Sequence, residues 1–278
     1  MLEKFWLTHS GYYRVFRNIL VAGGGFERVK MPFIFGIGLH AKYGPILMDA
    51  PFDESGPANM GTITSTFLSN TGLSFEPDWS VAGRLQELDF STDDVEQVLV
   101  THLHGDHTGA MKQLENATFH IDTAEWEHAN NVSLSGRLLG EYCPDDYAEL
   151  KDQMKCRKDL PALDDGQGFD IFGDGSVEAF SVPGHTPGHC VYRLHVGGGH
   201  TIFYAADAAH TFKQLHGEAG PGLMPRQFTQ DMPRAEEGLA AIRRHLEKHP
   251  DDELVLCHDP TLGERIIDEG VVEFGALE

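Results

Sequence analysis

Four side chains that can bind metal ions fall within six consecutive positions near the middle of the chain. They are His102, His104, Asp106 and His107, in the segment THLHGDHTG that begins at Thr101. Alternate residues of an extended segment point to one side, so residues 102, 104 and 106 share a side, and a following turn would bring residue 107 to the same place. Imidazole and carboxylate groups bind zinc, iron, cobalt and manganese. One ion cannot use four such ligands and keep an open position, so the cluster indicates two ions.

Three further candidate ligands lie downstream, each just after a run of residues typical of a strand. They are His185, Asp207 and His258. Strand ends that meet at one edge of a sheet would gather all seven side chains. One ion would then take His102, His104 and His185, and the other would take Asp106, His107 and His258. The two oxygens of Asp207 would bridge the ions.

A two-metal site of this kind has a direct chemical use. Two adjacent cations activate a bridging water as hydroxide near neutral pH and polarise a carbonyl or phosphoryl oxygen. Structural zinc sites are closed and often rich in cysteine, whereas this set of ligands has no cysteine and leaves a position open. We therefore expect a hydrolase, and we keep a metal-stabilised binding scaffold as the non-enzyme alternative. His189 is a candidate for orienting a ligand by hydrogen bonding.

The elements that must position these residues alternate between strands and helices. Strands are predicted at residues 33–40, 45–50, 98–101, 118–121 and 253–257. Hairpins are predicted at residues 169–182 and 191–206. Helices are predicted after Ser91, at residues 123–131 and at residues 231–249, and a polar, largely helical insertion is predicted at about 130–165. Residues 53–82 have no clear periodicity and are typical of a long loop. We expect stacked sheets flanked by helices in a single domain spanning residues 1–278.

The charge of the chain argues against two classes of partner. The 278 residues include 21 Lys and Arg and 43 Asp and Glu, for a formal net charge of −22. Such a charge repels nucleic acids and anionic membranes. No run reaches the roughly 18 apolar residues of a membrane span, and the start of the chain lacks the features of a secretory signal. We therefore expect a cytoplasmic protein that acts on a small molecule, and a homodimer is compatible with the sequence.

The HxHxDH pattern at residues 102–107 and the later His185, Asp207 and His258 resemble the metallo-β-lactamase superfamily. The resemblance runs from about residue 30 to residue 265. It implies an α+β fold, a four-layer αββα sandwich, with two divalent ions at one edge of the two sheets. Zinc is the expected metal, and iron, cobalt and manganese are the alternatives.

Within that superfamily, three segments resemble the N-acyl homoserine lactonases. They are residues 44–49 (GPILMD), residues 183–189 (PGHTPGH) and residues 257–259 (CHD). Those lactonases often have Asp-Thr-Gly where this chain has Asp49-Ala-Pro51. They also often carry a tyrosine three residues after the bridging Asp, where this chain has His210.

The resemblance implies that a bridging hydroxide opens a lactone ring. Asp106 would carry a proton to the leaving alkoxide, and His210 would donate a hydrogen bond to the substrate carbonyl. Apolar side chains would contact an acyl tail, and the candidates are Phe67, Leu68, Phe75, Trp79, Phe212, Leu223, Met224 and Phe228. The alternatives are a phosphotriesterase or another ester or thioester hydrolase of the same superfamily.

Overall fold

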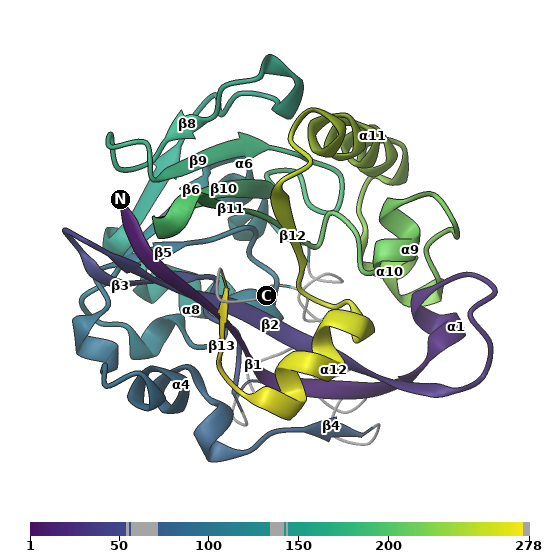
Figure 1. Ribbon diagram of the computed structural model, residues 1–278, viewed down its shortest axis with the longest axis horizontal. Coiled ribbons are helices and arrows are strands. Elements are labelled where there is room, and N and C mark those ends of the chain that lie inside the picture. Colours follow the sequence, from purple (N-terminus) through teal and green to yellow (C-terminus); the bar gives the residue numbers. More distant parts are fainter. Residues whose placement is uncertain (54–55, 57–71, 134–141, 143, 275–278) are drawn as a thin grey trace.

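Strands run through the whole described chain, with helices between them. The structure is a computed structural model that describes residues 1–53, 56, 72–133, 142 and 144–274 (Figure 1). The first strands are β1 (Leu2–Phe16), β2 (Arg28–His40), β3 (Gly44–Met48), β4 (Leu73–Ser74), β5 (Gln97–Leu99) and β6 (Thr118–Asp122). The later strands are β7 (Met154–Arg157), β8 (Phe169–Asp170), β9 (Val177–Ser181), β10 (Cys190–Val196), β11 (His200–Ala206), β12 (Asp252–Leu256) and β13 (Val272–Phe274).

The described helices are short, apart from α11, which has 17 residues. They are α1 (Arg17–Leu20), α4 (Val81–Glu87), α5 (Gly105–Thr108), α6 (Thr123–Asn130), α8 (Pro144–Glu149), α9 (Phe212–Leu215), α10 (Leu223–Phe228), α11 (Met232–Lys248) and α12 (Pro260–Glu269). Single 3-10 turns are η1 (Pro77–Trp79), η2 (Thr92–Asp94), η3 (Met111–Gln113), η4 (Lys151–Gln153), η5 (Leu163–Asp165) and η6 (Gly197–Gly199). Within the described residues, no helix has the length and the apolar composition needed to cross a membrane.

The strands join into one mixed sheet that curls back on itself. Its order is β12-β11-β10-β1-β2-β3-β5-β6-β7, and β9 pairs with β10. The long strands β1 and β2 are antiparallel neighbours, and Leu2 of β1 also pairs with Val196 of β10. The two halves of the sheet therefore meet at β1.

Alternating side chains show that each half of the sheet is buried on both faces. In β3, Ile46 and Met48 belong to a core between the two halves, and Leu47 belongs to an outer core with Val81 of α4. β11 follows the same rule, because its even-numbered residues from Ile202 to Ala206 face the central core. The residues between them, such as Phe203, pack in a third core with residues of α11. Side chains of a strand alternate between faces, so these cores lie in successive layers.

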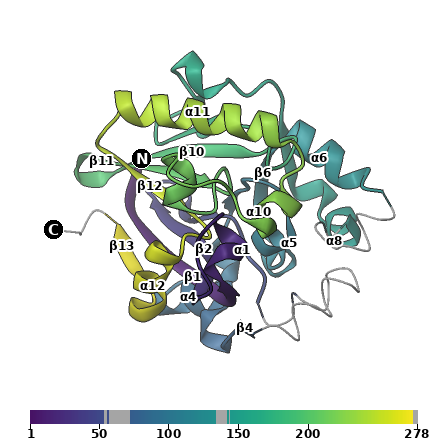
Figure 2. The same ribbon diagram turned by 90° about the vertical axis from the view of Figure 1, so that its right-hand side faces the viewer.

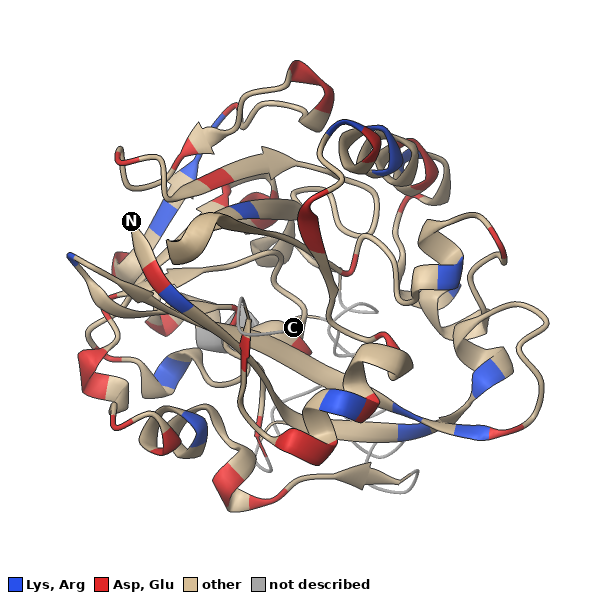
Figure 3. Cartoon of the chain, in the orientation of Figure 1, with Lys and Arg blue, Asp and Glu red and all other residues tan. Residues whose placement is uncertain are grey.

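Helices cover the two outer faces. Helix α11 lies on one side of the molecule and α4 on the opposite side (Figures 1 and 2). The four-layer αββα architecture and the α+β class expected from the sequence are thereby confirmed. Acidic and basic residues are interspersed on the outer helices α4, α11 and α12 (Figure 3). Charges of both signs on these helices nearly cancel, so most of the net charge of −22 lies elsewhere in the chain.

Local sequence signals explain where the flanking helices begin. The Asp231 carboxylate accepts the backbone N–H of Arg234 at 3.0 Å at the start of α11. The Asp259 carboxylate accepts the N–H groups of Thr261 and Leu262 at 2.8 and 3.1 Å at the start of α12, where Pro260 is the first helical residue. Both are N-caps that satisfy backbone donors left over at a helix start.

Most of the predicted elements are confirmed. The predicted strands correspond to β2, β3, β5, β6 and β12, and the predicted hairpins correspond to β8–β9 and β10–β11. The predicted helices at residues 123–131 and 231–249 correspond to α6 and α11.

One expectation was wrong, and one long strand was not predicted. Strand β1 joins the two halves of the sheet, whereas no strand had been expected before residue 33. Within the expected helical insertion, α8 is a helix, but Met154–Arg157 form β7, which pairs with β6 in parallel. The short helix expected after Ser91 is the 3-10 helix η2, with Ser91 as its N-cap.

Candidate metal centre

The first three candidate ligands come from two loops that follow strands of different halves of the sheet. His102 and His104 follow β5, and His185 follows β9. The distance between His102 Nε2 and His104 Nδ1 is 3.1 Å, and that between His104 Nδ1 and His185 Nε2 is 3.0 Å. All three side chains are buried. We call these three residues the first triad.

A second group of ligands lies beside the first. Asp106 and His107 lie on α5, and His258 follows β12. The Nε2 atom of His258 is 3.3 Å from Oδ2 of Asp106, and each of the three residues offers a ligand atom within 4.8 Å of the others. We call these residues the second triad.

Asp207 lies between the two triads. Its Oδ2 atom is 3.4 Å from Nε2 of His185 in the first triad and 3.1 Å from Nε2 of His258 in the second. Its Oδ1 atom is 3.4 Å from Nε2 of His107. The preceding residue, Ala206, has a positive φ of 45°, a strained conformation for a residue with a side chain. All seven residues predicted from the sequence are therefore brought together around one carboxylate.

The donor atoms are arranged to suit cations rather than one another. The buried atoms His107 Nε2 and Asp207 Oδ1 have no hydrogen-bond partner among the described residues, although buried polar atoms nearly always have one. Three imidazole nitrogens of the first triad point at a common place, where neutral rings cannot all satisfy one another. Zinc binds imidazole nitrogen at about 2.0–2.1 Å, which separates two nitrogens on one tetrahedral ion by roughly 3.3 Å. The residues present therefore fit divalent cations.

Hydrogen bonds on the far side of the rings fix their orientation. His107 Nδ1 is 2.9 Å from Oδ2 of Asp49, and Asp49 also accepts the backbone N–H of Thr101 at 2.8 Å. His258 Nδ1 is 2.8 Å from the carbonyl oxygen of Pro32. Such contacts fix the tautomer of a ligating imidazole. Asp49 was not predicted as part of the site, although its position near the end of the predicted strand at residues 45–50 was an available signal. Its φ of 62° is positive, which is uncommon for a residue with a side chain.

The two triads differ in their electrostatics. Burial lowers the pKa of His102 and His185 well below the usual value and that of His104 to about 4. Burial also acts to lower the pKa of His107 and His258 in the second triad, but the nearby carboxylates, above all that of Asp207, have a larger opposite effect. They raise the pKa of His107 well above its usual value and that of His258 to about 10. Cation binding is therefore expected to be coupled to proton release more strongly at the second triad than at the first.

The loop that carries His185 is tied to the start of α11. The carbonyl oxygens of Gly184 and His185 accept backbone N–H groups of Asp231 and Gln230 at 2.9 and 3.0 Å. A Cβ atom at Gly184 would lie 2.3 Å from the backbone nitrogen of Ala235, and the φ of Gly184 is 143°. Only glycine allows this close approach.

A second carboxylate outside the ligand set, that of Glu125, lies between the two loops of the first triad. Glu125 is fully buried on α6, and it accepts backbone N–H groups from both loops. Burial raises its pKa to about 7, and the N–H donors act in the opposite direction. Glu125 was not among the residues predicted from the sequence.

Two further histidines border the centre. His210 is buried, its Nε2 atom is 3.8 Å from Oδ2 of Asp207, and its ring stacks on that of His258. Burial lowers the pKa of His210 to about 4, although Asp207 opposes this. Among the described residues, neither ring nitrogen of the buried His189 has a hydrogen-bond partner. The expectation that His189 orients a ligand by hydrogen bonding was therefore wrong.

An apolar cluster adjoins the second triad. The ring of Phe33 packs edge-on against His258 with centroids 5.9 Å apart, and it also contacts Phe52 and Phe75. Met224 packs on the same cluster. Of the residues expected near an acyl tail, Phe75 and Met224 thus lie in this cluster, whereas Trp79 packs on His9 and Tyr12.

The remaining residues expected near an acyl tail lie elsewhere or outside the described part. Phe212 packs with the core under α11, Leu223 is exposed and Phe228 is half-buried. Phe67 and Leu68 lie outside the described residues.

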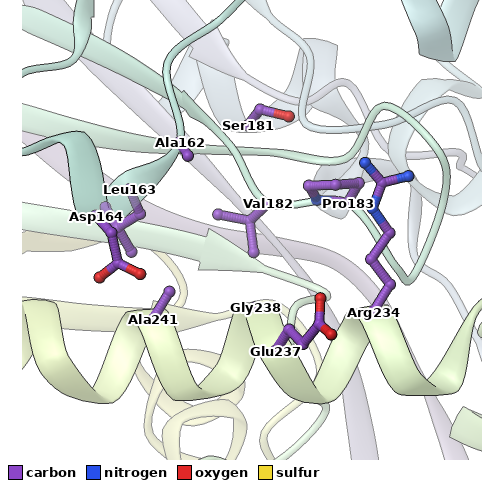
Figure 4. A pocket seen from close by; sticks show the side chains of 10 residues that line it. All are labelled: Ala162, Leu163, Asp164, Ser181, Val182, Pro183, Arg234, Glu237, Gly238 and Ala241. Atoms are coloured by element: carbon purple, nitrogen blue, oxygen red, sulfur yellow. The ribbon is translucent and has the colours of Figure 1, made fainter.

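A separate cavity of about 140 Å³ lies between α11 and the segments around Leu163 and Val182. Figure 4 shows that its lining mixes the apolar side chains with those of Asp164, Arg234 and Glu237. None of the seven candidate ligands lines it, so it is distinct from the metal centre.

Comparison with known proteins adds independent information. The family model described as the Metallo-beta-lactamase superfamily matches residues 67–258, a range that includes all seven candidate ligands. The N-acyl homoserine lactonase AttM of Agrobacterium fabrum is 31% identical over 185 residues. That alignment covers 66% of this chain and 66% of the relative, so it spans slightly less than two thirds of each.

Solved structures share the fold across nearly the whole chain. An N-acyl homoserine lactone hydrolase, solved with the product N-hexanoyl-L-homoserine at its catalytic metal centre, has a TM-score of 0.71 and 17% identity. That match covers 95% of this chain and 96% of the other. AidC, a dizinc quorum-quenching lactonase, has a TM-score of 0.66 and 18% identity over 93% of this chain and 90% of its own.

Proposed function

Because the chain belongs to the metallo-beta-lactamase superfamily, we propose that it is a metal-dependent hydrolase that opens lactone rings. N-acyl homoserine lactones are the substrate class that we propose. The observation that carries the proposal is the convergence of two triads of donors on the single carboxylate of Asp207. The relative named above, the N-acyl homoserine lactonase AttM, supports the substrate class.

The first triad would hold one divalent cation, the second triad would hold another, and Asp207 would contact both. We propose zinc, and the same donors also suit iron, cobalt and manganese. When bound, such a pair of cations supplies a nucleophilic water near neutral pH and polarises the substrate carbonyl.

Two residues beside the triads would handle hydrogen bonds and protons. His210, neutral at physiological pH because of its low pKa, can carry its proton on Nε2, the atom that faces Asp207. There it would donate a hydrogen bond to the substrate carbonyl or to the ring oxygen. Asp106 is 23% exposed, and its carboxylate would accept a proton and deliver it to the leaving alkoxide.

The cluster of Phe33, Phe52, Phe75 and Met224 supports a substrate with an apolar part. It touches His258 through Phe33. Phe33 and Phe52 are buried, so an acyl chain beside the cations would contact the half-buried Phe75 and Met224. Burial of each methylene against such side chains contributes about 0.8 kcal/mol. The proposal therefore favours acylated lactones over small unsubstituted ones.

A substrate panel on the zinc-loaded protein tests the proposal. It would contain N-acyl homoserine lactones of several tail lengths, γ- and δ-lactones, thioesters, phosphotriesters and β-lactams. We expect the acyl lactones to be hydrolysed best, with loss of hydrolysis on chelation and recovery on adding zinc. Good turnover of a phosphotriester without opening of any lactone would replace this activity with a phosphotriesterase. Two bound cations without hydrolysis of any ester would favour a binding scaffold.

Three further expectations remain proposals. We infer a single domain spanning residues 1–278 and a cytoplasmic location. We also infer that the protein can form a homodimer. Size-exclusion chromatography with light scattering tests the homodimer, and a single cooperative unfolding transition supports the single domain.

A further inference from the structure

We propose that Glu125 is a positioning residue that holds the two loops of the first triad at a fixed mutual distance and thereby sets the cation affinity of that triad. The inference rests on the proposed metal-dependent function. It concerns a residue that does not itself reach the ligands.

The carboxylate of Glu125 connects the two loops directly. Its Oε1 atom accepts the backbone N–H of Leu103 at 2.9 Å, and its Oε2 atom accepts the backbone N–H of Gly188 at 3.0 Å. Leu103 lies between His102 and His104, and Gly188 lies three residues after His185. One rigid group therefore joins the backbone that carries two ligands to the backbone that carries the third.

The placement of this carboxylate is unusual for its position in the helix. Glu125 is the third residue of α6, after the N-cap Asp122, whose carboxylate accepts the N–H of Ala124. A glutamate at this position commonly turns back to the N-cap backbone in a capping box. Here it is fully buried and directed at the two loops. Burying a carboxylate is costly unless it is well hydrogen-bonded, so the arrangement indicates a role beyond starting the helix.

The packing leaves the loop little freedom to move. A Cβ atom at Gly188 would lie 2.2 Å from the backbone nitrogen of Glu125 and 2.6 Å from its Cβ atom. The loop therefore lies directly against the start of α6. Leu103, on the other side of the carboxylate, is also fully buried.

The geometry makes the expected effect selective. Within the first triad, the 3.0 Å separation of His104 Nδ1 and His185 Nε2 spans the two loops that Glu125 connects. The second triad comes from α5 and from the end of β12, and it contains no residue of the His185 loop. Weakening the contact of Glu125 should therefore reduce cation affinity at the first triad and spare the second.

Zinc titration of chelator-treated protein, in competition with a chromophoric chelator, tests this. In Glu125→Gln, the amide oxygen can accept one N–H, but the amide NH₂ group faces the other donor. We expect one of the two zinc affinities to fall 10- to 100-fold, as for other residues that orient ligands, and the other to stay unchanged. Glu127→Gln is the matched control, because Glu127 is exposed on the same helix.

Single-triad backgrounds identify which affinity changes. With His258→Ala, the first triad remains complete, and adding Glu125→Gln should lower its zinc affinity. With His185→Ala, the second triad remains complete, and adding Glu125→Gln should leave its zinc affinity unaltered. Equal losses of zinc affinity in both backgrounds would mean a general structural role and would overturn the inference. Unchanged zinc affinity in the His258→Ala background would also overturn it.

Glu125→Asp covers the case in which the glutamine variant does not fold. It keeps the charge but shortens the side chain by one methylene, so the carboxylate can reach only one loop. The same selective loss is expected, with thermal unfolding of the cation-free protein as the check on folding. Wild-type zinc affinity in a folded Glu125→Asp variant would overturn the inference about Glu125 but not the proposed function. Absence of zinc binding in the wild type would overturn the proposed function as well.

Discussion

Buried histidines occur both inside and outside the metal centre, and the partners of their ring nitrogens distinguish the two groups. His9 and His120 are as buried as His102. Outside the centre, Arg84 Nη2 is 3.1 Å from His9 Nε2, and Arg157 Nη2 is 3.2 Å from His120 Nδ1. Each neutral imidazole there accepts a hydrogen bond from a guanidinium. Burial, with the guanidinium charge acting in the same direction, lowers the pKa of both rings to about 3.

Inside the centre, ring nitrogens face other imidazoles and carboxylates instead. His104 Nδ1 faces two further imidazoles, and His107 Nε2 faces a carboxylate oxygen without forming a hydrogen bond. Burial alone therefore does not identify a metal ligand. The identifying feature is an imidazole nitrogen that faces other potential ligand atoms instead of a guanidinium. Changes in the two regions should therefore affect different properties. Substitutions in the centre should reduce hydrolysis, and substitutions around the outer histidines should reduce stability.

The largest effect is expected from Asp207→Ala, because Asp207 touches both triads. Hydrolysis should fall by about 10²- to 10³-fold, as when a group that stabilises a transition state is removed, and His107→Ala should behave similarly. The core should still fold, as measured by circular dichroism. Asp164→Ala, in an exposed ion pair, is the control. Wild-type turnover in Asp207→Ala would contradict the assignment of the centre.

The next effect is expected outside the centre, from Arg84→Met. Arg84 donates to both the ring nitrogen and the carbonyl oxygen of His9, and two buried acceptors left unsatisfied cost about 3 kcal/mol. Urea unfolding should show this loss of stability while hydrolysis and zinc content stay unchanged. A lower zinc content at unchanged stability would break the distinction between the two regions.

Acidification should reduce stability through the outer histidines. The unfolded chain takes up a proton on His120 below its ordinary pKa of 6.5, whereas the folded chain resists it until the pKa of about 3. The unfolded state then holds more protons, so stability falls as the pH drops, by about 2 kcal/mol between pH 6.5 and pH 5.

A difference measurement isolates this contribution from any release of cations. Urea unfolding at both pH values should give a smaller acid-induced loss in His120→Gln than in the wild type. His216→Gln, at an exposed position, should keep the wild-type loss. Equal losses in all three proteins would show that His120 accepts its proton in the folded state too.

The smallest effect is expected at the border of the centre. His210→Phe removes one hydrogen-bond donor, so kcat/KM should fall about tenfold, or about 1.4 kcal/mol, with zinc content unchanged. His210→Tyr, which restores a donor, should recover much of the loss. Loss of a cation in His210→Phe would instead make His210 a ligand.

Dense local patterns were predictable, and contacts set by the fold were not. The spacing of His102, His104 and His107 and the strand-end positions of the later ligands predicted which residues would meet. Strand β1 was missed because both of its faces are buried, so it lacks the alternation of polar and apolar residues by which strands are recognised. Glu125 was missed because an acidic residue at the third helical position is typical of an exposed cap. Its partners belong to loops that only the tertiary fold brings near.

The anchoring of the His258 ring to the carbonyl oxygen of Pro32 links the last candidate ligand to β2. Two segments that are 226 residues apart in the sequence must therefore both be in place before the second triad is complete. Completion of this triad thus reports that the N-terminal and C-terminal parts of the fold have come together.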